Sequence, residues 1–361
     1  MIIFLFIVGF AAVLVTGLSV LKRDAWWIRI FDFPRVLITV IAITVLIAFL
    51  PWWNRNDPMH NLYIFLLGIS VAYQLILMLP YTPLWKKQVK SATKEHAENR
   101  VSLLVTNILM TNRSPDAYRR LLETHDPDIH IIIEADDWWM NELTDLGQRY
   151  PHRVLHPMDN TYGLLLYSKI PLEDTRVQFL AEKDVPSIHG IIRLSDQHRI
   201  QFHCVHPRPP AQGKHMDTTH RDAELLLVAK AVKTSDLPAL VLGDFNDVAW
   251  SHTTRLFQRI SGLRDPRIGR GLYSTFHTKY PLLRFPLDHI FHSGEFQLVN
   301  FHRCQYIGSD HFPLFATLQF TESFTTEETE IESLQSEHQA DHQEANRKIE
   351  KSEILNDIIL T

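Results

Sequence analysis

Residues 239–247 read ALVLGDFND. The apolar residues that open this stretch have the length and composition of a buried strand, and a polar group follows them at once. Asp244 and Asn246 therefore stand where the strand ends, which is where an α/β scaffold presents side chains to a cleft. Taken alone, the polar group is equally compatible with an ordinary Asp/Asn turn, so the rest of the chain has to decide between the two interpretations.

Other apolar runs are bordered by polar residues in the same way. The residues concerned are Asn107 after residues 101–106, Glu134 after residues 129–133, His206 after residues 200–205, and Asp310 and His311 before residues 314–320. Asp288 stands inside the apolar stretch FPLDHIF, where a carboxylate is costly unless it is paired. Each residue alone also fits a solvated strand end, a loop or a structural ion pair. Their shared position at strand ends is what predicts a site.

The oxygen donors among these residues suit a hard divalent cation. Mg²⁺ takes oxygen ligands, typically carboxylates together with substrate phosphate and water. Glu134 and Asp310 supply carboxylates, and Asn107 supplies a neutral oxygen. The two cysteines, Cys204 and Cys304, have no partner at zinc-site spacing. We therefore expect Mg²⁺ or Mn²⁺ at Asn107, Glu134 and Asp310, where the metal would neutralise phosphoryl charge and orient an attacking water.

The remaining polar residues at the strand ends are of the types that move protons in hydrolytic reactions. They are His206, His311 and the carboxylates of Asp244 and Asp288. Together with Asn246 they form the predicted catalytic set.

Beyond residue 100, short apolar runs of β type alternate with helical patterns. This alternation is typical of an α/β or layered α+β domain. Residues 218–233 show a clear amphipathic helical pattern, and Pro115 opens another over residues 115–124. With 361 residues, the chain is long enough for one large domain or two smaller ones.

The N-terminal part is far more apolar than the rest. Its runs at residues 2–21, 36–53 and 62–79 each approach the roughly 20 residues that a helix needs to cross a hydrocarbon core. A signal peptide is an alternative for the first run, but no basic segment precedes it. A buried helical domain is an alternative for all three, but soluble helices keep a polar stripe that these runs lack. Amphipathic rings stand at the run ends, namely Trp26, Trp27, Trp52, Trp53, Tyr81 and Trp85.

These patterns divide the chain into four parts. We expect a transmembrane anchor of about three helices at residues 1–85, a linker at 86–100, a catalytic domain at 101–320 and an acidic tail at 321–361 that is disordered or loosely helical. Residues 354–360 could form an interaction helix, but a solvated tail is the preferred interpretation. The tail holds 11 acidic and 3 basic residues. Because the formal charge of the whole chain is −5, the remainder is close to neutral, which argues weakly against nucleic acid as the main partner.

The sequence resembles the endonuclease/exonuclease/phosphatase superfamily, whose members include DNase-I-like nucleases, sphingomyelinases and inositol-polyphosphate phosphatases. The resemblance covers about residues 102–320. Its most specific parts are GDFND at 243–247 and SDHFP at 309–313, supported in the same order by IIIEADDWW at 131–139, VHPRPP at 205–210 and PLDHI at 286–290. The resemblance implies a four-layer sandwich of the α/β (α+β) class, in which two packed β-sheets are flanked by helices.

Carried over position by position, the resemblance implies that Asn107, Glu134 and Asp310 surround the metal. Asp244 and Asn246 would position or activate the attacking water and grip the scissile phosphate. These roles agree with the ligand preference of Mg²⁺ that the residue types alone suggest.

The histidines take two further roles by the same resemblance. His311, paired with Asp288, would act on the phosphate or as the general base. His206 would protonate the leaving group. The sequence departs from the pattern at one point, because it offers no evident acidic partner for His206.

Basic residues around HPRPP are candidates for binding the substrate. We expect His189, which lies in an alternating strand pattern, to contribute together with Arg208 and Arg221. Such cations near a metal cleft can hold a second phosphate or a headgroup. The same cluster contains Lys214, His215 and His220. A solvated basic loop is an equally good interpretation of the cluster.

Three N-terminal spans in front of this domain are similar to the membrane-anchored bacterial branch of the superfamily, which includes glycopeptide-resistance and undecaprenyl-pyrophosphate phosphatase-type proteins. An anchor confines the cleft to the bilayer surface, so we expect a phosphorylated lipid or small molecule as substrate. The fold alone does not decide this. The alternatives are a membrane-tethered nuclease and a non-catalytic membrane protein on the same scaffold. We expect the lipid bilayer as partner and no obligate protein partner.

Two features of the chain point to opposite sides of the membrane. The first connecting loop carries Lys22, Arg23, Arg29 and Arg35, so positive-inside counting favours a cytoplasmic catalytic domain. The membrane-bound branch that the chain resembles is associated with lipid carriers on the outer face. The two indications nearly balance, and we expect a multi-pass protein of the plasma (inner) membrane with an extracytoplasmic catalytic domain.

Overall fold

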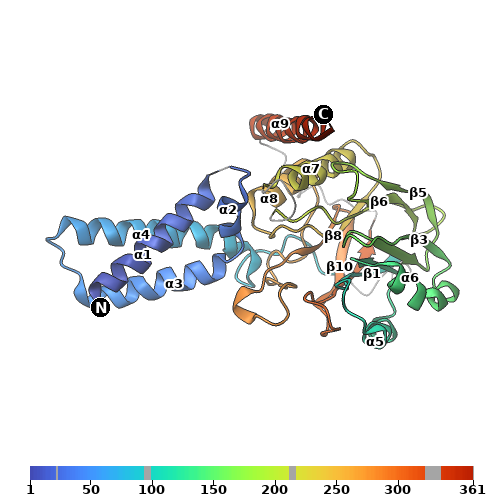
Figure 1. The fold of residues 1–361 in the computed structure, drawn as a ribbon, viewed down its shortest axis with the longest axis horizontal. Helices are drawn as coiled ribbons and strands as arrows, with labels where there is room; N and C mark the ends of the chain where they lie inside the picture. Colours follow the sequence, from blue (N-terminus) through green and yellow to red (C-terminus); the bar gives the residue numbers. More distant parts are fainter. Residues whose placement is uncertain (22, 93–98, 211–216, 322–334, 361) are drawn as a thin grey trace.

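The computed structural model describes residues 1–21, 23–92, 99–210, 217–321 and 335–360. Its N-terminal part is a bundle of α1 (Ile2–Val20), α3 (Arg35–Phe49) and α4 (Pro58–Met78) (Figure 1). Each of these helices, with the short helical turns that extend α3 and α4, is long and apolar enough to cross a membrane. The prediction of about three helices of spanning length is therefore confirmed.

The connection between α1 and α3, residues 24–34, folds against the domain that follows residue 99, and we call it the α1–α3 loop. It contains the short helices α2 (Trp26–Arg29) and η1 (Ile30–Asp32). The buried Asp32 carboxylate pairs with Arg35, whose guanidinium also donates to Gln74 Oε1 at 2.7 Å. Trp250 Nε1 of that domain donates to the Asp32 carbonyl at 2.7 Å. The loop is thus bonded to both parts of the chain.

The domain that follows residue 99, which we call the C-terminal domain, contains two mixed β-sheets. The first sheet has six strands in the order β10-β11-β1-β2-β4-β3, and the second has five in the order β5-β6-β7-β8-β9. The strands of the first sheet are β1 (Arg100–Asn107), β2 (Ile129–Ile133), β3 (His152–His156), β4 (Leu164–Ser168), β10 (Phe296–Arg303) and β11 (Leu314–Phe320). Those of the second sheet are β5 (Leu172–Gln178), β6 (Ser187–Arg193), β7 (Arg199–Val205), β8 (Ala239–Asp244) and β9 (Asp288–His292).

The two sheets pack face to face around one apolar core. Alternate residues of β1 and β2, such as Leu103 and Ile131, meet residues of β7 and β8, such as Phe202 and Leu242, and all of these are buried. The opposite faces carry helices. α5 (Pro115–His125) and α6 (Asp137–Glu142) cover the first sheet, and α7 (Thr219–Lys233) and α8 (His252–Ser261) cover the second. This helix–sheet–sheet–helix arrangement confirms the predicted four-layer sandwich (Figure 1).

Part of the expected linker packs on the domain. Val89 is fully buried in the core between the sheets, and Ser91 forms a β-bridge with Leu298 of the edge strand β10. The Gln88 amide donates to the Ile268 carbonyl at 3.4 Å. Residues 93–98 lie outside the described part of the chain.

The C-terminal segment corrects the expectation of a disordered tail for residues 335–360. They form α9 (Gln335–Leu360), which packs on α7 and α8. Ala345 and Ile349, one turn apart, are buried in the apolar cluster that α7 also lines. Lys348 Nζ contacts Asp222 Oδ2 at 2.8 Å and Asp24 Oδ1 at 2.6 Å. Of the two expected states, the helical one occurs here and is packed rather than solvated, because a few apolar contacts and one buried ion pair dock the helix although its sequence is mostly polar. Residues 322–334 lie outside the described residues.

Candidate active site

The metal-ligand candidates of the first sheet lie side by side because β1 and β2 are parallel. Asn107 ends β1 and pairs in register with Ile133, the last residue of β2, so Glu134 follows beside it. Asn107 Nδ2 donates to Glu134 Oε1 at 2.8 Å. Asn107 Oδ1 accepts from the Leu109 amide at 3.1 Å. The parallel pairing therefore brings two strand-end residues to one point, as expected.

The second sheet contributes Asp244, which ends β8. Asn107 Nδ2 also donates to Asp244 Oδ2, at 3.1 Å, so this amide links the two sheets. Gly243 has φ of 143°, and a Cβ there would lie 1.9 Å from the Val205 carbonyl oxygen of the neighbouring strand. Only glycine permits that approach. The backbone then turns, and the Asn246 amide donates to Asp244 Oδ1 at 2.8 Å.

The SDHFP segment closes the site from the other side. Ser309 Oγ donates to the Asn107 carbonyl at 2.8 Å and accepts from the His311 amide at 3.0 Å. His311 Nδ1 lies 2.8 Å from Asp288 Oδ2, and its Nε2 lies 3.6 Å from Asp244 Oδ2. The imidazole is thus held between two carboxylates that come from adjacent strands of the second sheet.

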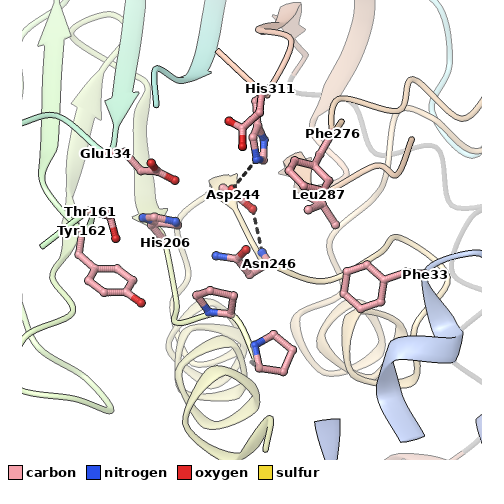
Figure 2. A pocket seen from close by; sticks show the side chains of 13 residues that line it. Phe33, Glu134, Thr161, Tyr162, His206, Asp244, Asn246, Phe276, Leu287 and His311 are labelled. Carbon is pink, nitrogen blue, oxygen red and sulfur yellow. Dashed lines mark hydrogen bonds and ion pairs between the residues drawn. The ribbon is translucent and has the colours of Figure 1, made fainter. Parts of the chain in front are cut away.

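These residues surround a cavity of about 340 Å³. Figure 2 shows Glu134 and His206 on one side of it and Phe33 on the other, with Asp244, Asn246 and His311 between them. Phe276 lies beside His311, with 4.9 Å between the ring centroids, so the polar part of the lining passes into an apolar part toward Phe33. The remaining lining residues are Thr161, Tyr162, Pro209, Pro210, Leu287 and Asp310.

The ionised form of the carboxylates in the cavity is unfavourable without a bound cation. Burial raises the pKa of Glu134 to about 7, although the hydrogen bond from Asn107 opposes the shift, and the charges of Asp244 and Asp310 add to it. Burial also raises the pKa of Asp244, with the nearby His311 opposing the rise. Buried carboxylates that repel one another require a cation to remain ionised.

The pKa values of the two histidines of the site are shifted in opposite directions. Burial lowers the pKa of His311, but the Asp288 and Asp244 carboxylates outweigh it and raise the value to about 10. Burial lowers the pKa of His206 to about 4, with Asp244 opposing the shift. At neutral pH His311 is therefore an imidazolium and His206 is neutral. Within the described residues, His206 Nδ1 has no hydrogen-bond partner, in agreement with the lack of an evident acidic partner in the sequence.

The donor set fits a hard divalent cation. In the described part of the chain, no Lys or Arg side chain forms an ion pair with Glu134, Asp244 or Asp310. These oxygen donors converge with the Asn107 side chain at the polar end of the cavity. A hard cation would relieve the cost of burying them, and oxygen ligands without a thiolate favour Mg²⁺ or Mn²⁺ over softer metals. Asp244 and Asp288 with His311 form a second group whose ligand atoms lie within 4.8 Å of one another.

Three residues that line the cavity have a left-handed backbone. The φ angles are 62° for Glu134, 71° for Thr161 and 49° for Asn246. Side chains other than glycine rarely adopt this conformation, and such residues concentrate at functional sites. The local backbone thus serves to aim these side chains rather than to continue the strands.

Unlike most of the predicted catalytic residues, the predicted substrate-binding residues do not line the cavity. Arg208 lies at the rim of the cavity, with its guanidinium 5.2 Å from the Tyr162 ring centroid, and it pairs with Glu182 and Asp184. Its charge is therefore already partly neutralised. His189 does not line the cavity. Its ring lies 2.6 Å from the ring of His203 on the neighbouring strand.

Arg221 is buried behind the site rather than in it. Its guanidinium donates to the Asn246 carbonyl at 2.9 Å and pairs with Asp222 and Asp247. It therefore supports the catalytic loop and does not line the cavity. Of the other basic residues around HPRPP, His220 bonds to Ser352 at 2.7 Å, whereas Lys214 and His215 lie outside the described residues.

Sequence reasoning missed the apolar half of the cavity. Phe33 comes from the α1–α3 loop, and Phe276 and Leu287 come from the segment before β9. The wall also includes Tyr162, whose ring lies 5.3 Å from that of His206. A local pattern could not indicate Phe33, because it reaches the site through the docking of the anchor on the domain.

Several solved structures are similar to this chain. The solved endonuclease/exonuclease/phosphatase structure from Bacteroides vulgatus is 18% identical, covers 61% of this chain and 99% of its own, and superimposes with a TM-score of 0.50. The catalytic domain of human Nocturnin is 16% identical over 62% of this chain and 95% of its own, with a TM-score of 0.49. D. rerio TDP2 complexed with single-strand DNA product is 16% identical over 61% of this chain and 99% of its own, also with a TM-score of 0.49. No curated protein matches this chain significantly.

The match to a sequence family carries the assignment. The pattern of the Endonuclease/Exonuclease/phosphatase family extends over residues 104–311, which is more than half of the chain. It includes Glu134, Asp244 and His311, which line the cavity, and Asn107, which is buried behind the lining and bonded to Glu134 and Asp244. The chain belongs to the endonuclease/exonuclease/phosphatase family, whose enzymes typically hydrolyse phosphate esters and use divalent metals.

Proposed function

We propose that this protein is a membrane-anchored, divalent-metal-dependent phosphoesterase that hydrolyses a phosphate ester or pyrophosphate of a lipid or small molecule. Family membership supports the reaction class. The three apolar helices support the anchor. The substrate class and the link between catalysis and the membrane depend on the composition of the cavity.

One observation supports this link above all others. Phe33, which lies between two candidate membrane spans, lines the same cavity as Glu134, Asp244 and His311 (Figure 2). A substrate bound there meets carboxylates and an imidazolium at one end and the aromatic side chain at the other. This polarity suits a phosphate headgroup whose apolar part faces the anchor.

The polar end would hold the metal. Asn107, Glu134 and Asp310 would bind Mg²⁺ or Mn²⁺, which when bound supplies charge neutralisation at the phosphoryl group and lowers the pKa of water. The Asn107 amide nitrogen donates to Glu134 and Asp244 and so holds these two carboxylates in place before substrate arrives. The Asn107 oxygen, which accepts from the Leu109 amide, would have to turn toward the metal to bind it.

The neighbouring residues would orient the reactants. Asp244, whose Oδ1 already accepts from the Asn246 amide, would accept a proton from the attacking water. Protonated His311, held by Asp288, would donate to a phosphoryl oxygen. Neutral His206 would hydrogen-bond the leaving oxygen. Of the two roles that the family resemblance implies for His311, contact with the phosphate is favoured over that of general base, because the raised pKa keeps the ring charged.

The location follows from the anchor. We propose a multi-pass protein of the plasma (inner) membrane with an extracytoplasmic catalytic domain and with no obligate protein partner. Arg29 and Arg35, two of the basic residues in the first connection, are buried beside Asp32. The single Asp32 carboxylate therefore compensates part of their charge, which weakens the positive-inside indication of a cytoplasmic domain.

A substrate panel tests the proposal. Full-length protein in nanodiscs would be given a lipid phosphate, a lipid pyrophosphate, a soluble aryl phosphodiester and plasmid DNA, each with Mg²⁺ at physiological salt. We expect the lipid phosphates to be turned over best. Efficient nicking of plasmid without activity on lipid phosphates would favour the membrane-tethered nuclease, and inactivity toward all four would favour a non-catalytic protein.

A further inference from the structure

An exposed apolar hairpin protrudes from the catalytic domain between the cavity and the anchor. Phe276 and Phe285 pair as its base, with the Phe276 amide donating to the Phe285 carbonyl at 3.0 Å. The tip contains Tyr280, Leu282 and Leu283, whose exposed fractions are 57%, 78% and 47%. We call residues 276–285 the 276–285 hairpin. Adjacent leucines exposed at a loop tip are unfavourable in water, and such exposed apolar groups indicate an interaction site.

The hairpin lies on the anchor side of the domain. The Phe285 ring meets the ring of Phe33 edge-on, with 5.7 Å between centroids. Phe276 and Phe285 pack against the apolar cluster that contains Tyr81, at the end of the third candidate span. Figure 1 shows the orange segment of the hairpin beside the end of the helical bundle.

Other exposed apolar side chains occur at the same end of the bundle. Trp27 and Ile30 in the α1–α3 loop are 52% and 47% exposed, and Leu84 and Trp85 after α4 are 87% and 46% exposed. Exposed lysines stand nearby in the chain, namely Lys86, Lys87 and Lys279. Tryptophan and tyrosine favour the membrane interface, and lysines beside them favour anionic headgroups.

We propose that the 276–285 hairpin inserts its tip into the interfacial region of the bilayer, in the leaflet where α1 ends and α3 begins. The surface is continuous with the candidate spans, which is why we assign lipid rather than a protein partner to it. Phe276 at the hairpin base and Phe33 in the α1–α3 loop both line the cavity. The cavity would therefore open beside the headgroups, between two membrane-inserted segments. This inference rests on the membrane anchoring in the proposed function.

Because the spans retain the protein in the membrane whatever the hairpin does, the test has to measure the surroundings of the tip. An environment-sensitive fluorophore would be attached in nanodiscs at Leu282→Cys and, in a second variant, at Leu283→Cys. Thr124→Cys is the exposed control on α5, which lies away from the bundle in Figure 1. Leu14→Cys, 63% exposed on α1, is the control within a span. The native Cys204 and Cys304 are buried, so wild-type protein gives the labelling blank.

Brominated lipids should quench the probes at 282 and 283 severalfold more than the probe at 124. Quenching at 282 and 283 no greater than at 124, with strong quenching at 14, would overturn the insertion while leaving the anchor intact. Weak quenching at 14 would instead reject the anchoring on which both proposals depend. In a second measurement, the double variant Leu282→Ser/Leu283→Ser should raise KM severalfold for a bilayer-embedded lipid phosphate and leave KM for a soluble phosphodiester unchanged. An equal change for both substrates would contradict the inference.

Discussion

His311 Nδ1 lies 2.8 Å from Asp288 Oδ2, and both groups are almost completely buried. The other ring nitrogen faces Asp244 at 3.6 Å. Asp288 therefore fixes the ring with Nε2 toward the cavity, and it is a main reason why the pKa of His311 is raised to about 10. The two carboxylates thus favour the charged form of His311, at the place where we propose that a phosphoryl group binds.

The contact between Asp288 and His311 allows the charge of His311 to be reduced while the side-chain volumes stay the same. Asp288→Asn keeps the side-chain volume but lowers the pKa of His311, so kcat should fall by about 10²-fold, within the range typical of positioned acid–base groups. His311→Ala should cost at least as much. Steady-state kinetics on purified protein checks both, with circular dichroism to establish that the fold is intact. Rates near the wild-type value in both variants would refute the assignment.

The raised pKa of Glu134 predicts that the stability of the metal-free protein depends on pH. Its pKa is raised by burial from an ordinary value of 4.5 to about 7. The folded state therefore binds the proton more tightly than the unfolded state, so the contribution of Glu134 to stability is fully present below pH 4.5 and is lost as pH rises through 7. Excess Mn²⁺ should restore thermal stability at alkaline pH, because the metal replaces the proton.

Glu134→Gln supplies the control for this linkage. Measured by thermal unfolding in detergent, the variant should lose less stability than wild type as pH rises through the pKa of Glu134, because one titrating group is gone. It should also be stabilised less by Mn²⁺. The same pH profile and the same metal response as wild type would show that Glu134 is not a ligand.

Phe33 predicts that the anchor takes part in binding. Phe33→Ala removes one aromatic contact, typically worth about 1 kcal/mol, so KM for a lipid phosphate should rise about fivefold with little change in kcat. Phe179→Ala is the matched control, because Phe179 is 44% exposed and does not line the cavity. An unchanged KM in the first variant would remove the main support for a cavity shared between domain and anchor.

Lys348 predicts how α9 is held. Its ammonium bridges Asp222 and Asp24, and the side chain is only 10% exposed. Lys348→Met should weaken the docking of α9 by about 3 kcal/mol. This value is at the low end for breaking a buried ion pair, because Asp222 remains paired with Arg221 in the variant.

Lys351 provides the comparison for that change. It contacts Asp24 at 2.7 Å but is 47% exposed, so Lys351→Met should cost less than about 1 kcal/mol. Hydrogen–deuterium exchange of residues 339–353 measures how far each substitution loosens the docking of α9. Equal exchange in the two variants would show that burial of the Lys348 pair does not hold the helix.

Several elements can be predicted from the sequence because their side chains are buried on both faces. Residues 129–133 and 314–320 are predicted as strands, and β2 and β11 have these limits. The strands that the sequence does not indicate, β3, β5 and β10, are all at sheet edges. Edge strands need fewer apolar residues, and β5 reads LEDTRVQ, so no apolar run marks it.

The polar half of the site can be predicted for a similar reason. Parallel pairing of β1 with β2 and of β7 with β8 brings strand-end residues together, so position in the sequence is enough for Asn107 and Asp244. It is not enough for His189, because strand register turns its ring toward His203. Phe33 depends on how the anchor packs on the domain, which no local pattern encodes.

Metal-dependent hydrolysis in the cavity can be measured directly. Full-length protein in nanodiscs would hydrolyse a lipid phosphate after thorough chelation and then with Mg²⁺ or Mn²⁺ added back, in wild type and Asp244→Ala. We expect wild-type turnover to vanish on chelation and return with metal, and the variant to remain at least about 10²-fold slower at every metal concentration. Turnover that survives chelation, or an Asp244→Ala protein as active as wild type, would contradict a metal-dependent hydrolytic site in this cavity.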